Sequence, residues 1–187
     1  MEARKIHTPL TDEVIASLRA GDMVLLSGDV YTARDAAHRR MHEAIKKGLS
    51  LPIDLKTATI FYAAPTPTPP GKVIGSIGPT TSYRMDAFTP TLIRHGLRGM
   101  IGKGNRLPEV IEAIKKHKAV YFGAIGGIAA LTAKGVKKME PVAYEDLGPE
   151  AICKLTVVDL PVIVVNDPAG RDLYAQERDR WRIIVES

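Results

Sequence analysis

The sequence predicts an α/β protein with a mixed β-sheet. Short β-branched and apolar segments alternate with segments whose apolar residues recur at helical spacing, and glycine or proline separates most of them. The spacing becomes irregular in the second half of the chain, which argues against a regular doubly wound sheet. The chain has 187 residues, 45% of them hydrophobic, so it is long enough to bury a substantial core.

A helix, a strand and a second helix are predicted at the start of the chain. Thr11 is a suitable N-cap for a short helix, because acidic residues follow it. Residues 22–27 form an apolar strand, which we expect Gly28 to interrupt. The cap-x-x-acid pattern at Thr32–Asp35 begins a longer helix that ends before Gly48.

The middle of the chain is predicted to be a strand followed by irregular structure. Residues 57–62 are β-branched and aromatic, as is typical of strands. Residues 65–71 are rich in proline, which excludes a helix or a central strand. We expect a stiff, ordered segment there, with a flexible linker as the alternative. Residues 75–86 show no apolar periodicity and are expected to be neither helix nor buried strand.

The second half of the chain alternates between strands and helices. Thr89 and Pro90 are a good N-cap and first residue for a short helix that Gly96 ends. The remaining strands are predicted at 98–101, 119–123, 136–144, 156–158 and 162–165, and the remaining helices at 108–118, 128–134, 149–154 and 171–182. No internal repeat or boundary is visible, so residues 1–187 are expected to form a single domain.

Composition excludes several classes of protein. No apolar run reaches the roughly 18–20 residues of a membrane span, and the N-terminus lacks an apolar signal segment, so we expect a cytoplasmic protein. The net charge of +5 comes from scattered basic pairs, and few aromatic residues are available for base stacking, which disfavours nucleic-acid binding. The single cysteine, Cys153, is interpreted as buried filler, and no metal site is predicted.

A small-anion site is predicted in the segment Gly75–Asp86. Two glycines bring backbone N–H groups close to a ligand, while four serine and threonine hydroxyls and Arg84 can bind a carboxylate or phosphate. Arg34 lies at a helix start, where a cation is unfavourable unless it binds a carboxylate or forms a salt bridge with Asp35 or a remote acid. Lys103, between two glycines, either presents its ammonium to a ligand or is a solvated turn residue.

Two further features have structural interpretations. His38, one helical turn after Arg34, is expected to lie at the surface or to support the site from behind. The glycine-rich turn Gly123–Gly127 lacks the spacing of a dinucleotide fingerprint, so a packing turn is favoured.

Four ordered blocks of the chain resemble the iron–sulfur (class I) fumarase and L-tartrate dehydratase family. Leu160 and Arg171 depart from the family pattern, in which phenylalanine and asparagine are expected. The blocks and the flanking matches are Ser27–Gly28 with Tyr31–His38, Pro69–Gly71 with Ile74–Ser76, Gly78–Ser82 with Arg84–Asp86, Met100–Gly104, Tyr121–Gly127, Asp159 with Pro161, and Gly170 with Asp172–Tyr174.

The resemblance implies a β subunit, equivalent to the C-terminal domain of the single-chain enzymes, with a three-layer swivelling β/β/α fold. In the family an α subunit carries the three cysteines that hold a [4Fe–4S] cluster. The resemblance thus implies an α-subunit partner, a chain that is inactive alone, and further self-association of αβ pairs into a dimer of dimers.

The implied reaction is reversible addition or removal of water on a small dicarboxylate, with fumarate and malate expected first and tartrate next. By motif position, Arg34, Arg84 and Lys103 would hold the substrate carboxylates, with Thr81 also binding substrate. Thr80 would contact the reacting carbon and is a proposed base in the family, so Thr80 and Arg84 are the implied catalytic residues. The alternative is a non-catalytic dicarboxylate-binding or regulatory module with the same fold.

Overall fold

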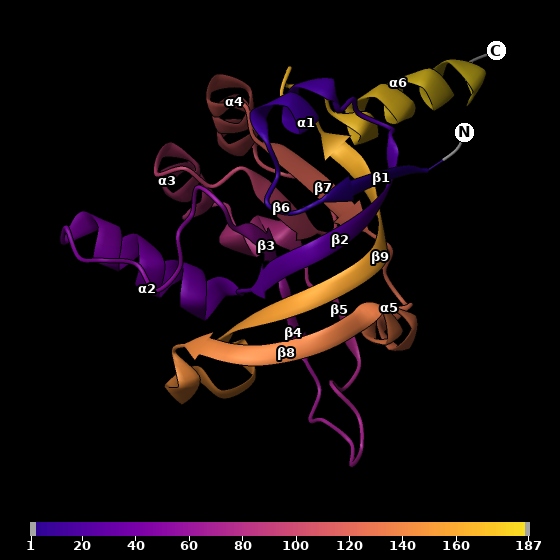
Figure 1. Cartoon of the computed structure of the whole chain (residues 1–187). Helices are drawn as coiled ribbons and strands as arrows, with labels where there is room; N and C mark the ends of the chain where they lie inside the picture. The colour runs from indigo at the N-terminus through magenta and orange to yellow at the C-terminus, as the bar shows by residue number, and fades with distance from the viewer. Residues whose placement is uncertain (1–2, 186–187) are drawn as a thin grey trace.

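The structure, a computed structural model, describes residues 3–185, with side chains described to residue 182. It contains one large mixed sheet (Figure 1). The sheet has the strand order β1 (Arg4–His7), β2 (Met23–Thr32), β3 (Thr59–Phe61), β6 (Gly99–Gly102), β7 (Val120–Ala124), β9 (Ile152–Asn166) and β8 (Val136–Ala143). The predicted α/β class with a mixed sheet is confirmed.

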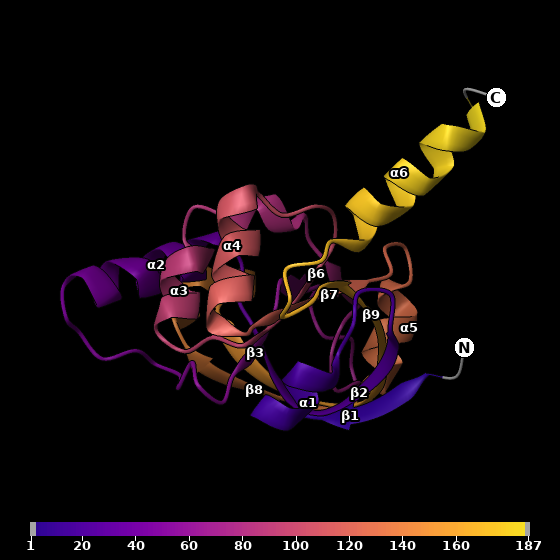
Figure 2. The ribbon, with the colours of Figure 1, turned by 90° about the horizontal axis from the view of Figure 1, so that it is seen from above.

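The sheet closes on itself through strand β9. Strands β1, β2, β3, β6 and β7 are parallel to their neighbours in this set, whereas β9 runs antiparallel to β7, β8 and β2. Because β9 pairs with both β7 and β2, the strands β2, β3, β6, β7 and β9 form a ring. In Figure 2 the ring is flattened, with β1, β2 and β8 forming one layer and β6 and β7 lying between them and the helices.

Three helices form the third layer of this β/β/α arrangement. They are α2 (Asp35–Lys46), α3 (Thr89–Arg94) and α4 (Pro108–His117), and all three lie on the same side of the sheet (Figure 2). Met41, Leu92 and Ile114 from these helices are fully buried with Met100 and Tyr121 of the sheet. A second apolar cluster, which includes Leu26, Val30, Phe122, Leu155 and Val162, lies on the opposite faces of the strands.

The first two helices begin in different ways. In α1 (Asp12–Ser17), the Thr11 side chain accepts a hydrogen bond from the Val14 N–H at 3.2 Å, as predicted. Helix α2 has Arg34 as its N-cap, with no capping side chain. The cap predicted at Thr32 is wrong, because the Thr32 hydroxyl accepts from the Cys153 N–H of β9 at 3.0 Å instead.

Two predicted interruptions of strands are absent. Strand β2 continues through Gly28, where a bulge shifts its pairing with β9 and φ is +108°. Strand β9 is continuous over the residues predicted as two strands, and it also includes Ile152–Lys154, which were predicted as the end of a helix. The predicted helix is absent: the 3-10 segment η2 (Glu145–Glu150), in which Gly148 has a non-helical φ of +56°, leads directly into β9.

The proline-rich segment belongs to a hairpin that projects from the sheet (Figure 1). Strand β4 (Ala63–Pro65) pairs antiparallel with β5 (Ile77–Pro79), and the Thr66 N–H donates to the Ser76 carbonyl. The expectation that residues 75–86 contain no buried strand is wrong, because Ile77 in β5 is fully buried. A 3-10 helix, η1 (Ser82–Met85), follows β5.

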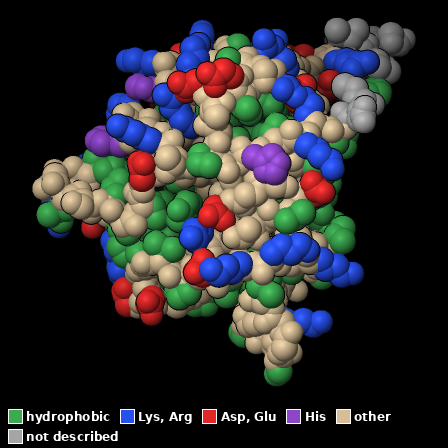
Figure 3. Space-filling view, viewed as in Figure 1, with side chains coloured by type: hydrophobic (Ala, Val, Ile, Leu, Met, Phe, Trp, Pro, Cys, Tyr) green, Lys and Arg blue, Asp and Glu red, His purple; other side chains and the backbone are tan. Residues whose placement is uncertain are grey.

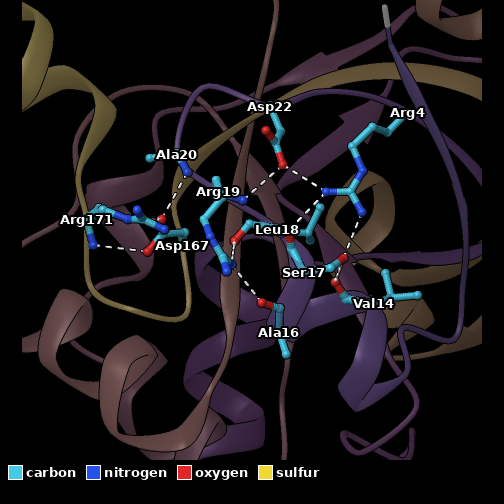
Figure 4. A network of polar contacts seen from close by, with 10 residues as sticks. All are labelled: Arg4, Val14, Ala16, Ser17, Leu18, Arg19, Ala20, Asp22, Asp167 and Arg171. Carbon is cyan, nitrogen blue, oxygen red and sulfur yellow. Dashed lines mark hydrogen bonds and ion pairs between the residues drawn. The ribbon is translucent and has the colours of Figure 1, made fainter.

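A polar network ties together segments that flank the amino end of β2 (Figure 4). Arg4 forms an ion pair with Asp22 at 3.0 Å, and Arg19 donates to carbonyls at the end of α1. Fully buried Asp167 accepts from the Ala20 N–H and pairs with Arg171 at 2.6 Å. These charges are used in structural contacts, at the end of β2 away from Arg34.

The remaining helices are α5 (Ala129–Gly135) and the C-terminal α6 (Leu173–Val185), which extends away from the body (Figure 2). No helix in the described part of the chain combines the length and apolarity needed to cross a membrane. On the face seen in Figure 3, basic side chains are spread out and interspersed with acidic ones.

Candidate active site

Two of the predicted site residues, Arg34 and Lys103, follow parallel strands of the sheet. Arg34 lies two residues after the end of β2, Tyr62 directly follows β3, and Lys103 directly follows β6. Since β2, β3 and β6 are adjacent and parallel, their carboxyl ends meet at one edge. In α/β folds, open or closed, ligands bind outside the carboxyl ends of parallel strands.

The segment after β5 docks against the ends of β3 and β6. The Thr80 N–H donates to the Tyr62 carbonyl at 2.7 Å, and the Lys103 N–H donates to the Thr80 carbonyl at 3.3 Å. The Ser82 N–H then donates to the Lys103 carbonyl at 2.9 Å, so Thr81 and Lys103 pair as in a parallel sheet. The structure therefore brings Thr80, Thr81 and Lys103 together.

Gly102 permits this close docking. A Cβ atom at Gly102 would lie 2.0 Å from the Ser82 hydroxyl and 2.8 Å from the Tyr62 ring. The Lys103 side chain, in turn, passes the glycine-rich turn after β7, since a Cβ at Gly126 would lie 3.9 Å from Lys103 Cδ. The turn Gly123–Gly127 therefore lies beside the Lys103 side chain.

Asp35 connects the two arginines of the predicted site. The Arg84 Nη2 lies 3.1 Å from the Asp35 Oδ2, and the Arg34 Nε lies 3.9 Å from the Asp35 Oδ1. Arg84 is on η1 and Arg34 is at the start of α2, so the contact joins two segments that are distant in sequence. It brings both guanidinium groups to the same carboxylate.

Glu150 reaches the same place from η2. Its Oε1 lies 3.2 Å from the Arg34 Nη2, and its Oε2 accepts from the Ala36 N–H at 3.4 Å. A carboxylate at the amino end of a helix is favoured by the free N–H groups and the helix dipole. Of the alternatives open for Arg34, the salt bridges to Asp35 and to a remote acid are both present.

Lys103 differs from the two arginines in its surroundings. Its side chain is exposed, and it forms no ion pair with any side chain between residues 3 and 182. Three cations and two carboxylates thus gather at this edge, which leaves an excess of one positive charge.

A buried polar network underlies the docked segment. Arg106 and Asp86 form a fully buried ion pair at 2.7 Å, and the Arg106 guanidinium lies over the rings of Tyr62 and Tyr121. The Tyr121 hydroxyl donates to the Gly104 carbonyl at 2.9 Å and lies 2.8 Å from the Ser82 hydroxyl. This network was not predicted, because nothing in the sequence distinguishes Arg106 from a surface arginine.

His38 is completely buried, so the surface alternative for it is wrong. Its ring lies edge-on to Tyr62 at 5.1 Å between centroids, and its Nδ1 lies 2.9 Å from the Arg34 carbonyl. That contact makes Nδ1 the protonated nitrogen, and the buried Nε2 has no partner in the part of the chain that the structure describes. Burial lowers the pKa of His38 to about 4, so the ring is neutral at pH 7.

The chain by itself does not fit an iron–sulfur cluster. In residues 3–182, no three His, Cys, Asp or Glu side chains gather in a geometry that could hold a metal ion. Cys153 lies on β9 with its N–H bonded to Thr32, and burial raises the pKa of its thiol. One partly buried thiol does not supply the several thiolates that such a cluster requires.

Comparison with known proteins gives a consistent set of relatives. The family model described as "Fumarase C-terminus" matches residues 2–177. The chain is 42% identical to "Fumarate hydratase 2" of Leishmania major and to "Fumarate hydratase class I, aerobic" of Salmonella typhimurium, over 83% and 81% of its length. It spans only 28% and 26% of those two proteins.

A relative of similar length comes from Methanocaldococcus jannaschii. It is named "Putative L(+)-tartrate dehydratase subunit beta" and is 37% identical over 89% of each chain. The match therefore covers almost the whole of both proteins, in contrast to the class I fumarate hydratases.

Proposed function

The chain belongs to the fumarase C-terminus family of hydro-lyases, and we propose that it is the β subunit of an enzyme that adds or removes water on a small dicarboxylate. We propose fumarate and malate as its first substrates and tartrate as the next. The similarity to a relative named as a β subunit, which covers 89% of each chain, supports the role of a subunit.

The observation that carries this proposal is the gathering of three cations at one edge of the sheet. Arg34 and Arg84 share the Asp35 carboxylate, and Lys103 is paired through its backbone with Thr81, three residues before Arg84. Arginine binds carboxylates through two parallel N–H donors, which fixes their orientation as well as their charge. A ligand with two carboxylates matches such a set better than a ligand with one.

We propose that Arg34, Arg84 and Lys103 hold the two carboxylates, with Thr81 also in contact with the substrate. Thr80 lies between this set and the end of β3, and within residues 3–182 its hydroxyl forms no hydrogen bond to the protein. That hydroxyl would face the carbon that gains or loses a proton. A threonine hydroxyl is a weak base, so it would need activation by a neighbouring group.

The Lewis-acid chemistry of the family has to come from outside this chain. An iron–sulfur cluster would be held by an α-subunit partner, because Cys153 alone does not ligate one. The exposed end of the sheet that carries Lys103 would then face the partner, and the two chains together would form the active site. We propose that the chain is cytoplasmic and assembles with its partner into αβ pairs, which associate further.

Co-purification with an iron–sulfur α subunit tests this proposal. The chain and a candidate α subunit are expressed separately and together, with the cluster reconstituted without oxygen, and hydration of fumarate is followed by absorbance. The two chains are expected to co-purify and to be active only in combination. Turnover by this chain alone, or an inactive complex with an intact cluster, would contradict it.

A further inference from the structure

We propose that Asp35 and Glu150 are positioning residues that pair with the two substrate-binding arginines and compete with the substrate carboxylates for them. This inference rests on the proposed function of the site. Asp35 contacts Arg84 at 3.1 Å and lies at a longer 3.9 Å from Arg34, and Glu150 contacts Arg34 at 3.2 Å. Both arginines therefore have a carboxylate partner before any ligand binds.

Glu150 sits where an anionic ligand would be expected. Arg34 is the N-cap of α2 but offers no capping side chain, so the first turn of the helix has free N–H groups. Glu150 supplies the missing acceptor to the Ala36 N–H, while its other oxygen pairs with Arg34. A side chain of the protein thus imitates a bound carboxylate at this position.

The ion pairs leave hydrogen-bonding capacity unused. The Arg34 Nε and the Asp35 Oδ1 are both inaccessible to solvent and have no hydrogen-bond partner among the described residues, and the 3.9 Å between them is too long for a hydrogen bond. A ligand carboxylate at Arg34 would give its Nε–H an acceptor that Asp35 does not provide. The resting arrangement is therefore one that an incoming carboxylate can improve.

The two roles have opposite effects on binding and on turnover. Removing the charge of Asp35 frees Arg84 for the ligand, so a dicarboxylate should bind more tightly. The same change removes the contact that fixes the Arg84 guanidinium, so turnover should fall. If Asp35 only stabilised the local structure, its replacement would weaken both the binding of the dicarboxylate and the turnover.

The test compares Asp35→Asn and Glu150→Gln with Asp146→Asn. Asp146 is on the same 3-10 segment as Glu150 and pairs with Arg40 at the surface, so its replacement makes the same change in net charge away from the site. The intact chain is titrated with fumarate by calorimetry at low ionic strength, after thermal unfolding has shown that each variant folds. Asp35→Asn and Glu150→Gln should each bind fumarate about fivefold more tightly than the unaltered chain. Asp146→Asn should bind as the unaltered chain does.

In complex with an iron–sulfur α subunit, Asp35→Asn should lower both KM and kcat. The inference would be overturned if Asp35→Asn and Glu150→Gln bound fumarate no more tightly than the unaltered chain. It would also be overturned if none of the proteins bound fumarate. Arg84→Ala separates this failure from that of the site itself. If Arg84→Ala leaves fumarate binding unchanged, the proposed site fails, whereas loss of binding in Arg84→Ala leaves the site standing.

Discussion

At the scale of single residues, His38 makes stability depend on pH. Burial lowers its pKa to about 4, whereas the unfolded chain has an ordinary histidine. Below about pH 6.5 the unfolded chain therefore binds a proton that the folded chain does not, and stability falls as the pH falls to about 4. The loss should be about 3 kcal/mol over this range, and no such loss arises from His38 above pH 7.

Urea unfolding at pH 7 and pH 4.5 measures this effect. Carboxylates also titrate in this range, so the informative quantity is the difference between variants. His38→Gln should show a clearly smaller loss of stability on acidification than the unaltered chain. His95→Gln, at an exposed position on the end of α3, should behave as the unaltered chain, and equal losses in all three proteins would contradict the assignment.

Local sequence patterns point to the basic residues of the proposed site more readily than to the acids beside them. Arg34, Arg84 and Lys103 stand out locally, since each is a cation beside a helix start or a glycine-rich turn. Glu150 could not be found this way, because it lies 116 positions after Arg34 and reaches it only through the fold. Arg106 was missed for the same reason, since its partner Asp86 is 20 residues away.

At the scale of elements, the glycine at the end of β6 determines how the Thr80–Ser82 segment docks. A Cβ at Gly102 would overlap the Ser82 hydroxyl and the Tyr62 ring, both of which are held in the buried network. We expect Gly102→Ala to lower the free energy of unfolding by about 1–3 kcal/mol, as overpacking does.

Gly126→Ala is the matched control for that substitution. A Cβ there would make only an ordinary contact with Lys103 Cδ at 3.9 Å. Thermal unfolding of the two variants should show a large decrease in Tm for Gly102→Ala and a small change for Gly126→Ala. Equal shifts would mean that the close docking at Gly102 is not what requires glycine.

The order of elements followed from local patterns, but their pairing did not. Amphipathic helices such as α2 and α4 were predicted within a few residues, because capping and periodicity are local signals. The continuity of β9 was not predicted, since Asp159 and Pro161 are residue types that are common in turns. In the structure Asp159 has φ +50° within the strand. Pairing with three other strands holds these residues in one strand.

At the scale of the whole molecule, the fold separates two groups of charges. The network of Arg4, Arg19, Asp22, Asp167 and Arg171 flanks the amino end of β2, and its arginines contact the two carboxylates or main-chain carbonyls (Figure 4). The proposed site lies after the carboxyl end of β2, where the cations exceed the carboxylates by one. In the first group the third cation, Arg19, donates to main-chain carbonyls, whereas the exposed Lys103 of the second group forms no ion pair with a side chain in residues 3–182 and is available to an anionic ligand, which supports the proposed site at that end of the sheet.

The turnover of Arg84→Ala in the complex with an iron–sulfur α subunit tests whether this chain supplies substrate-binding residues to a shared active site. Arg94→Ala, on the exposed surface of α3, is the control for loss of an arginine. We expect Arg84→Ala to fold and to co-purify with the α subunit. Its kcat/KM for fumarate should fall about 10²–10³-fold, while the kcat/KM of Arg94→Ala should be unchanged. Near-normal turnover of a folded Arg84→Ala complex would contradict the role of Arg84 in binding the substrate.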